Sequence, residues 1–175
     1  TVRDSIVIGN RGRLEGNDQR KGAGIAIFTS GLVTNTDIID NGGTSTSASQ
    51  VGGVYYGAGT VVDCRIVSNV SAGVELGSGM VLRHCTVSHT RSSLWTGRNV
   101  SLLAGNGMLT NCIVYGGVSS PGIYIDSDGN QVVDCVISNE ASGAFSFTAK
   151  GKMNRVQSGT VYDSSISLGN AAAAN

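Results

Sequence analysis

Four cysteines are the residues of this 175-residue chain with the most varied chemistry, and each directly follows a polar residue. The pairs are Asp63-Cys64, His84-Cys85, Asn111-Cys112 and Asp134-Cys135. Such a set could hold a metal ion, form disulfides or remain as free thiols. The cysteines are 21, 27 and 23 residues apart, which matches no zinc-binding signature. Their recurrence directs attention to the segments around them.

Each cysteine lies inside a short motif that the chain repeats: an aliphatic residue, any residue, Asp, Asn or His, then Cys, Ser or Thr, and two positions later a second aliphatic residue. The motif recurs at residues 2–7, 33–38, 61–66, 82–87, 109–114, 132–137 and 161–166. Its first polar position is filled by Asp4, Asn35, Asp63, His84, Asn111, Asp134 and Asp163, at steps of 21 to 31 residues. Repeats of this length are typical of solenoid proteins, in which each unit buries its apolar face against its neighbours.

Strands and turns make up the whole repeat. The aliphatic residues of each motif alternate with other residues, which is the period of a β-strand, and no run has helical spacing long enough to cross a sheet. A second strand is expected before most motifs, at residues 25–27, 54–56, 74–76, 100–102, 123–125 and 145–147. Equivalent residues that recur in one chain direction pair in parallel, and parallel crossovers are right-handed. The sequence predicts an all-β fold, a right-handed parallel β-helix of about seven coils.

One domain is expected, covering residues 1–168, with residues 169–175 as a tail outside the repeats. Because the first motif already starts at Val2, the apolar end of the first coil needs a cover. We therefore expect the chain to be an excerpt of a longer rod or a subunit that stacks end to end on itself.

The polar row and the cysteine row are both predicted to be structural ladders. Asp, Asn and His at a bend can bond to backbone amides, and small cysteine side chains suit a tight inner corner. Side chains stacked in parallel point the same way, so we favour free thiols over disulfides, with a metal site as the least favoured alternative.

Composition argues against two classes of partner. The chain has 12 basic and 12 acidic residues and a formal net charge of zero, which removes the electrostatic footprint of a nucleic-acid binder. No stretch approaches the 18 to 20 apolar residues of a membrane span, so no membrane insertion is expected. The 26 glycines and single proline are typical of a turn-rich fold.

Alternate residues of the second strands are predicted to form an exposed stripe that could stack on sugar rings, namely Tyr55, Glu75 and Tyr124. Trp95 and Arg98 in a neighbouring loop could wall this stripe. The alternative is that these aromatic residues are simply good strand formers.

A second candidate site is a loop with oxygen ligands at Asp126, Asp128 and Asn130, the alternate spacing of calcium loops. Its glycine, Gly129, comes one place early, and Ile137 stands where a bidentate glutamate is needed. A plain turn is therefore favoured, and calcium is the one cofactor left open. We assign no catalytic residue, because the paired carboxylates that cleave sugars are not apparent.

Four segments resemble a known repeat. Gly52-Gly53-Val54 and Ile66-Val67-Ser68-Asn69 resemble the paired Gly-Gly-aliphatic and aliphatic-x-x-Asn repeats of polymorphic-membrane-protein-type β-helices, as do residues 7–10 and 38–41. More broadly, residues 1–168 resemble the β-helix region of pectate-lyase-like secreted proteins. This resemblance implies an extracellular or cell-surface bacterial setting, in which members act as adhesins, passenger rods, polysaccharide binders or polysaccharide lyases.

Two functions follow as hypotheses. The first is a non-enzymatic extracellular rod, used as a structural spacer, an adhesin or a self-assembling fibre unit. The second is a polysaccharide-binding domain, or a polysaccharide lyase or hydrolase. The missing catalytic residues favour the first.

Overall fold

The computed structural model describes residues 1–11, 23–42, 51–55, 57–91, 97–117, 121–138, 145–147, 154–157, 159–162 and 166–168. Within these ranges the regular secondary structure consists of β-strands alone. The strands are β1 (Val2–Ile8), β2 (Ile25–Ala26), β3 (Leu32–Ile39), β4 (Val54–Tyr55), β5 (Thr60–Val62), β6 (Arg65–Val67), β7 (Ala72–Leu76), β8 (Val81–Arg83), β9 (Thr86–Ser88), β10 (Arg98–Leu102), β11 (Met108–Thr110), β12 (Ile113–Tyr115), β13 (Ile123–Ile125), β14 (Gln131–Val133), β15 (Val136–Ser138), β16 (Phe145–Phe147), β17 (Arg155–Gln157), β18 (Thr160–Tyr162) and β19 (Ile166–Leu168). Over these same residues no helix has the length and apolarity to cross a membrane.

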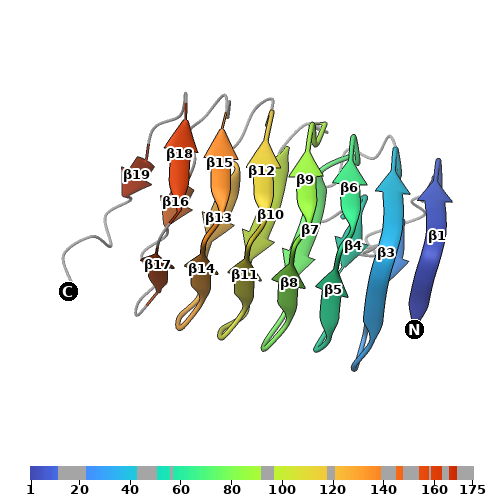
Figure 1. Ribbon diagram of the computed structural model, residues 1–175, viewed down its shortest axis with the longest axis horizontal. Helices are drawn as coiled ribbons and strands as arrows, with labels where there is room; N and C mark the ends of the chain where they lie inside the picture. The colour runs from blue at the N-terminus through green and yellow to red at the C-terminus, as the bar shows by residue number, and fades with distance from the viewer. Residues whose placement is uncertain are drawn as a thin grey trace, which may run out of the picture.

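The strands form two parallel sheets. The larger sheet has twelve strands. The first half of β3 pairs with β5, and the sheet continues from there through β8, β11, β14 and β17. The second half of β3 pairs with β6, and the sheet continues through β9, β12, β15 and β18. On the other side of β3, β1 pairs with it between Val33 and Ile39, and so along both halves. The smaller sheet has seven strands in the order β19-β16-β13-β10-β7-β4-β2. The strands stack from β1 at one end of the molecule to β19 at the other (Figure 1).

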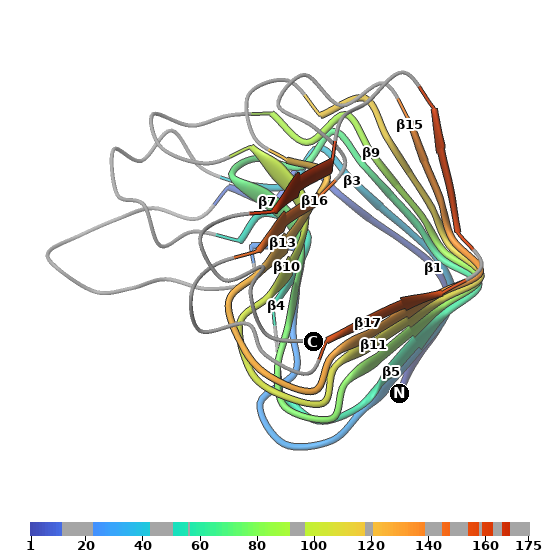
Figure 2. The ribbon, with the colours of Figure 1, turned by 90° about the vertical axis from the view of Figure 1, so that its left-hand side faces the viewer.

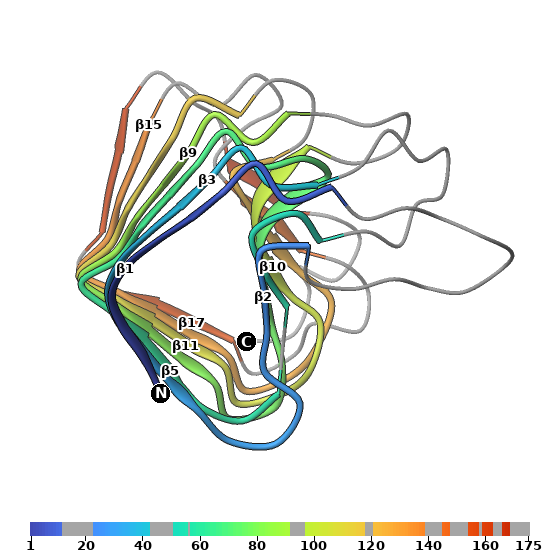
Figure 3. The same cartoon turned by 90° about the vertical axis from the view of Figure 1, so that its right-hand side faces the viewer.

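Seen along the rod, the coils enclose a three-sided core (Figure 2). Two sides come from the two halves of the larger sheet, which meet at a sharp corner, and the third side is the smaller sheet. In Figure 3, where the N-terminal coil is nearest the viewer, the chain runs clockwise as it recedes, so the coil is right-handed. The predicted right-handed parallel β-helix is confirmed.

Left-handed backbone conformations make the sharp corner. The first polar residue of each described motif has a positive φ, between 46° and 54°: Asp4, Asn35, Asp63, His84, Asn111 and Asp134. Asn, Asp and His tolerate this conformation better than most residues, which explains their recurrence here. Asp163, the last member of this polar row, lies outside the described residues.

A second corner follows five residues after the first. Its residues also have positive φ, between 51° and 70°: Gly9, Asp40, Ser68, His89 and Gly116. The β-strand between the two corners is therefore held at a fixed length in successive coils, which keeps the coils in register.

Stacked aliphatic side chains fill the core. The first aliphatic row of the motif is buried at Val33, Val61, Leu82, Leu109 and Val132. The second row is buried at Ile38, Ile66, Val87, Val114 and Ile137. The smaller sheet contributes a third set of buried residues: Val54, Val74, Leu76, Val100, Leu102, Ile123, Ile125 and Phe145. The expected second strands are thus confirmed as β2, β4, β7, β10, β13 and β16.

The Gly52-Gly53 pair is a packing requirement. A Cβ at Gly53 would lie 2.0 Å from the carbonyl oxygen of Gly73 in the next coil, and one at Gly52 would lie 2.4 Å from that of Asn41. Side chains essentially never approach so closely, so any larger residue would push the coils apart.

Candidate functional site

The cysteines form one column inside the rod, immediately after the first corner. The residue that follows each cysteine pairs with its counterpart in the next coil, so the cysteines stand in register. All four thiols are free, and none is more than 4% exposed. We call Cys64, Cys85, Cys112 and Cys135 the cysteine column.

All four side chains of the column have the same orientation. Each Sγ lies 3.2 to 3.3 Å from the carbonyl oxygen two residues earlier in its own coil, where it donates a weak hydrogen bond. A further contact links two coils, because the backbone N–H of Cys85 donates to Sγ of Cys112 over 3.4 Å. The cysteine side chains of successive coils are consequently stacked in parallel along the rod.

Thiol contacts and burial perturb the acidity of the column. The pKa of Cys85 is raised by its hydrogen bonds with the Cys112 and Cys64 thiols and by burial. The pKa of Cys135 is raised by its hydrogen bond with Cys112 and by burial. Hydrogen bonds within the same column lower the pKa of Cys64, through Cys85, and that of Cys112, through Cys135 and Cys85, so the direction of the shift alternates from coil to coil.

The polar row lies on the outside of the same corner. Asn35 Nδ2 donates to Asp4 Oδ1 over 2.8 Å, and His84 Nδ1 is 3.4 Å from Asp63 Oδ1. These contacts link neighbouring coils at the exposed edge of the rod. The polar row and the cysteine column thus occupy opposite sides of one bend.

A buried asparagine ladder at the second corner was not predicted as a set of site residues. Asn10 Nδ2 donates to Asn41 Oδ1 over 2.8 Å, and Asn41 Nδ2 donates to Asn69 Oδ1 over 3.1 Å. Asn41 and Asn69 are fully buried. The aliphatic-x-x-Asn segments carry this signal, since Asn10, Asn41 and Asn69 are their last residues.

In the next coil, the asparagine of the ladder comes from a different strand. Thr90 occupies the corner there, and its backbone N–H bonds to the side-chain oxygen of Asn99, which comes from β10. Asn99 Nδ2 then donates to the carbonyl oxygen of Tyr115 over 3.1 Å. An asparagine from another strand therefore replaces the missing one.

The predicted exposed stripe needs a correction at Tyr55. Tyr55 is only 4% exposed, because it packs with Val51, Ala72 and Ala26 in a small apolar cluster on the outer side of the smaller sheet. Phe28 also contacts its ring edge to face, at 6.4 Å between centroids. Tyr55 cannot therefore stack on a sugar ring from solvent.

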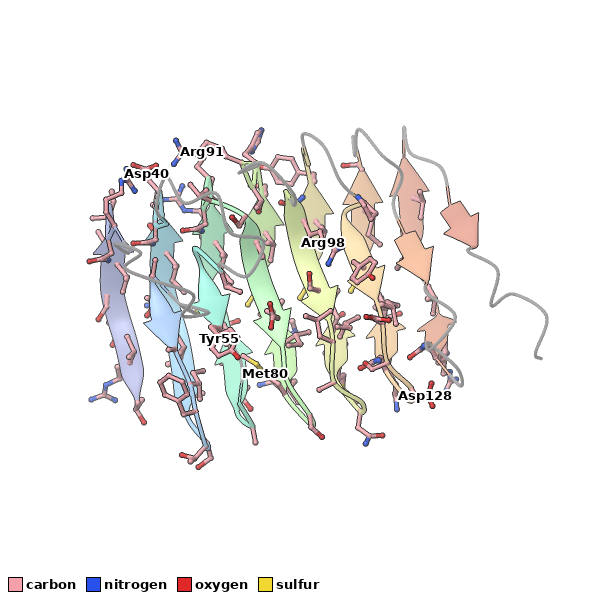
Figure 4. All side chains as sticks on the ribbon, turned by 180° about the vertical axis from the view of Figure 1, so that it is seen from behind. Asp40, Tyr55, Met80, Arg91, Arg98 and Asp128 are labelled. Atoms are coloured by element: carbon pink, nitrogen blue, oxygen red, sulfur yellow. The ribbon has the colours of Figure 1, made fainter. Side chains whose placement is uncertain are left out.

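The other members of the stripe lie further along the rod. Arg98 extends over Tyr124, with its guanidinium carbon 3.4 Å from the ring centroid (Figure 4). Burial lowers the pKa of Arg98, against the attraction of Tyr124, Asp126 and Glu75. Arg98, Tyr124 and Glu75 thus form one half-buried group. Trp95 lies outside the described residues.

In the loop suggested for calcium, the side chain of Asn130 forms hydrogen bonds within the protein. Asn130 is 1% exposed, its side-chain oxygen accepts the N–H of Gly107, and its amide nitrogen donates to Ser127. Asp128 is exposed and points away from the rod (Figure 4). The loop does not direct Asn130 toward a cation shared with Asp126 and Asp128. No group of three or more His, Cys, Asp and Glu side chains is placed to hold a metal ion in the described part of the chain.

Comparison of the chain with family models, curated proteins and solved structures finds no match. The parallel β-solenoid therefore stands on the structure itself. The finer likeness to pectate-lyase-like proteins and to polymorphic-membrane-protein repeats rests on the sequence motifs alone.

Proposed function

We propose that this protein is a non-enzymatic β-solenoid rod of the extracellular space or cell surface, extended end to end by a second copy. The observation that carries the proposal is the N-terminal face of the rod. Among the described strands, β1 pairs only with β3, so within this part of the chain its other edge presents backbone N–H and C=O groups that no strand covers. Such an edge is a template for another parallel strand.

Apolar side chains surround this edge. Phe28 is 77% exposed and Leu32 is 40% exposed. Both residues line a hollow that also includes Val2, Ile25 and Ile27. A further coil laid on this face would bury these side chains in the same way that each interior coil buries those of its neighbour.

The test is the assembly state at rising concentration. Sedimentation and negative-stain electron microscopy should show rods that lengthen with protein concentration. Phe28→Lys should reduce this growth at little cost to folding, because the ring is exposed. The matched control is Leu103→Lys, which changes an exposed apolar residue on the side of the rod. A monomer at all concentrations, or equal growth of the two variants, would contradict end-to-end stacking.

A cell-surface or secreted location is supported by the motif resemblance. Fractionation of the source cells with antibody against this chain tests the location independently of assembly. Recovery of the chain in the cytoplasm would remove the adhesin and spacer roles while leaving stacking open.

Polysaccharide binding is the second candidate function, supported by the Arg98–Tyr124 contact. An aromatic ring beside a guanidinium and the Glu75 carboxylate is suited to a sugar with polar edges and an apolar face. A glycan array should then show retention that is lost in Tyr124→Ala but kept in Tyr115→Ala, on another face. A screen for unsaturated uronate products would separate binding from lyase activity.

A further inference from the structure

The cysteine column has a geometry that disulfides do not use. Each coil is hydrogen-bonded to the next directly beside the thiols: the N–H of Thr86 bonds to the carbonyl of Cys64 at 3.0 Å, and that of Ile113 to Cys85 at 2.9 Å. Neighbouring cysteines are therefore one parallel-strand spacing apart, about 4.8 Å. A disulfide needs a Cβ–Cβ distance of about 3.8 Å and side chains that turn toward each other. Here the side chains are parallel.

The same geometry fits an ion coordinated by two sulfurs in a line. Metal–thiolate bonds are about 2.3 Å long, so a linear sulfur–metal–sulfur unit spans about 4.6 Å, close to the strand spacing. The side chains point into the rod, roughly perpendicular to its axis, while the ion would lie on the line between successive sulfurs. The angle at each sulfur is then near a right angle, as divalent sulfur prefers.

Because the cysteine column is buried, it favours an ion that forms a neutral complex with two thiolates. An uncompensated charge is costly in the core that surrounds the column, where neighbours such as Leu82 and Leu109 are fully buried. A monovalent soft ion with two thiolates would leave a net negative charge. A divalent soft ion with two thiolates is neutral. Soft ions are also the ones that prefer sulfur.

We propose that the cysteine column is a binding site for a divalent thiophilic ion, with mercury(II) as the defining case, held as a linear bis(thiolate) between cysteines of successive coils. Two S–H bonds break, two Hg–S bonds form, and two protons leave for the buffer, with no change in oxidation state. Four thiols bind two ions, one between Cys64 and Cys85 and one between Cys112 and Cys135.

Titration of the reduced full chain with mercury(II) chloride tests the site. A sulfur-to-mercury charge-transfer band should rise in the ultraviolet and stop at two ions per chain, with four protons released. X-ray absorption should give two sulfur neighbours at about 2.3 Å. Uptake of fewer than two ions, or a higher sulfur number, would overturn the proposal. So would fewer than four titratable thiols in the air-exposed, metal-free protein, since that result indicates disulfides.

Two double variants with the same number of thiols isolate the role of stacking. Cys64→Ser with Cys85→Ser keeps the neighbours Cys112 and Cys135, and should bind one ion. Cys64→Ser with Cys112→Ser leaves Cys85 and Cys135 about 9.6 Å apart, twice the strand spacing, and should bind none as a bis(thiolate). Serine suits this row because Ser5 already occupies it, and circular dichroism checks that each variant keeps its sheet. Equal uptake by the two variants would show that thiol count, and not the column, controls binding.

Discussion

Asn41 Nδ2 donates to Asn69 Oδ1 over 3.1 Å at a corner where neither side chain reaches solvent. Asn69 Oδ1 also accepts the backbone N–H of Asn41, and Asn69 Nδ2 donates to the carbonyl oxygen of Ile38. One side chain therefore completes three hydrogen bonds of the coil before it. The buried amide groups of Asn41 and Asn69 are thus satisfied by neighbouring coils of the stack.

Asn69→Ala is predicted to destabilise the fold by about 2 to 5 kcal/mol, because it leaves two or more buried polar groups without partners. Urea denaturation measures the loss. Asn10→Ala is the matched control, since Asn10 is an exposed member of the same ladder, and its loss should stay below about 1 kcal/mol. Equal losses would mean that the ladder is not a buried network.

Ile66→Ala is predicted to cost about 2 to 5 kcal/mol through lost apolar burial and the cavity left behind. Ile66 has no exposed surface. Ile113, on the outer face of the same sheet, is 46% exposed, so Ile113→Ala should change stability by about 0.5 kcal/mol or less. Thermal and urea unfolding of both variants test which face of the sheet is inside.

Backbone conformation at the first corner predicts an unusual substitution pattern. His84 has a φ of 52°, so His84→Val should cost about 1 to 2 kcal/mol from strain alone, whereas His84→Gly should be close to neutral. Arg83→Val is the control for valine itself, at the preceding exposed strand position. A tolerated valine at position 84 would contradict the left-handed bend.

The ion pairs of Asp40 are predicted to make a contribution to stability that is lost in acid. It bonds to Arg11 and Arg91 at the second corner, and the Arg11 hydrogen bond is the main cause that lowers its pKa. Figure 4 shows Asp40 and Arg91 at the same edge of the rod. A lowered carboxylate pKa stabilises the fold above the unfolded value of about 3.9, and this stabilisation is lost as the pH falls through the folded pKa.

The urea midpoints of the native chain and Asp40→Asn should therefore differ at pH 7 and converge as the pH falls through the lowered pKa of Asp40. The difference should be small and should shrink in 1 M salt, because the side chains are exposed. A difference that persists unchanged at pH 2 would exclude the ion pairs as its source.

The core could be predicted from sequence because its signal is local and repeated. The motif positions filled by Val61, Asp63, Cys64 and Ile66 in one coil recur in every coil. One motif therefore identifies the buried aliphatic rows, the bend and the cysteine column. The actual reason for Asp, Asn and His at the bend is their tolerance of positive φ, which the motif alone does not reveal.

The surface could not be predicted in the same way. Alternation along a strand places Tyr55 on the outer face of the sheet, but it does not show that Val51 and Ala72 cover that face. The replacement of one asparagine by Asn99 from another strand is equally invisible, because it depends on contacts between segments whose spacing varies from coil to coil.

Each coil pairs only with its two immediate neighbours, as β11 does with β8 and β14. The number of coils can therefore change in evolution without a change in this pairing pattern. Tandem duplication of a whole period, such as the 27 residues from Cys85 to Asn111, would present the same edges to its flanks as before. The length of the rod can therefore change by whole coils while the backbone contacts between coils stay the same.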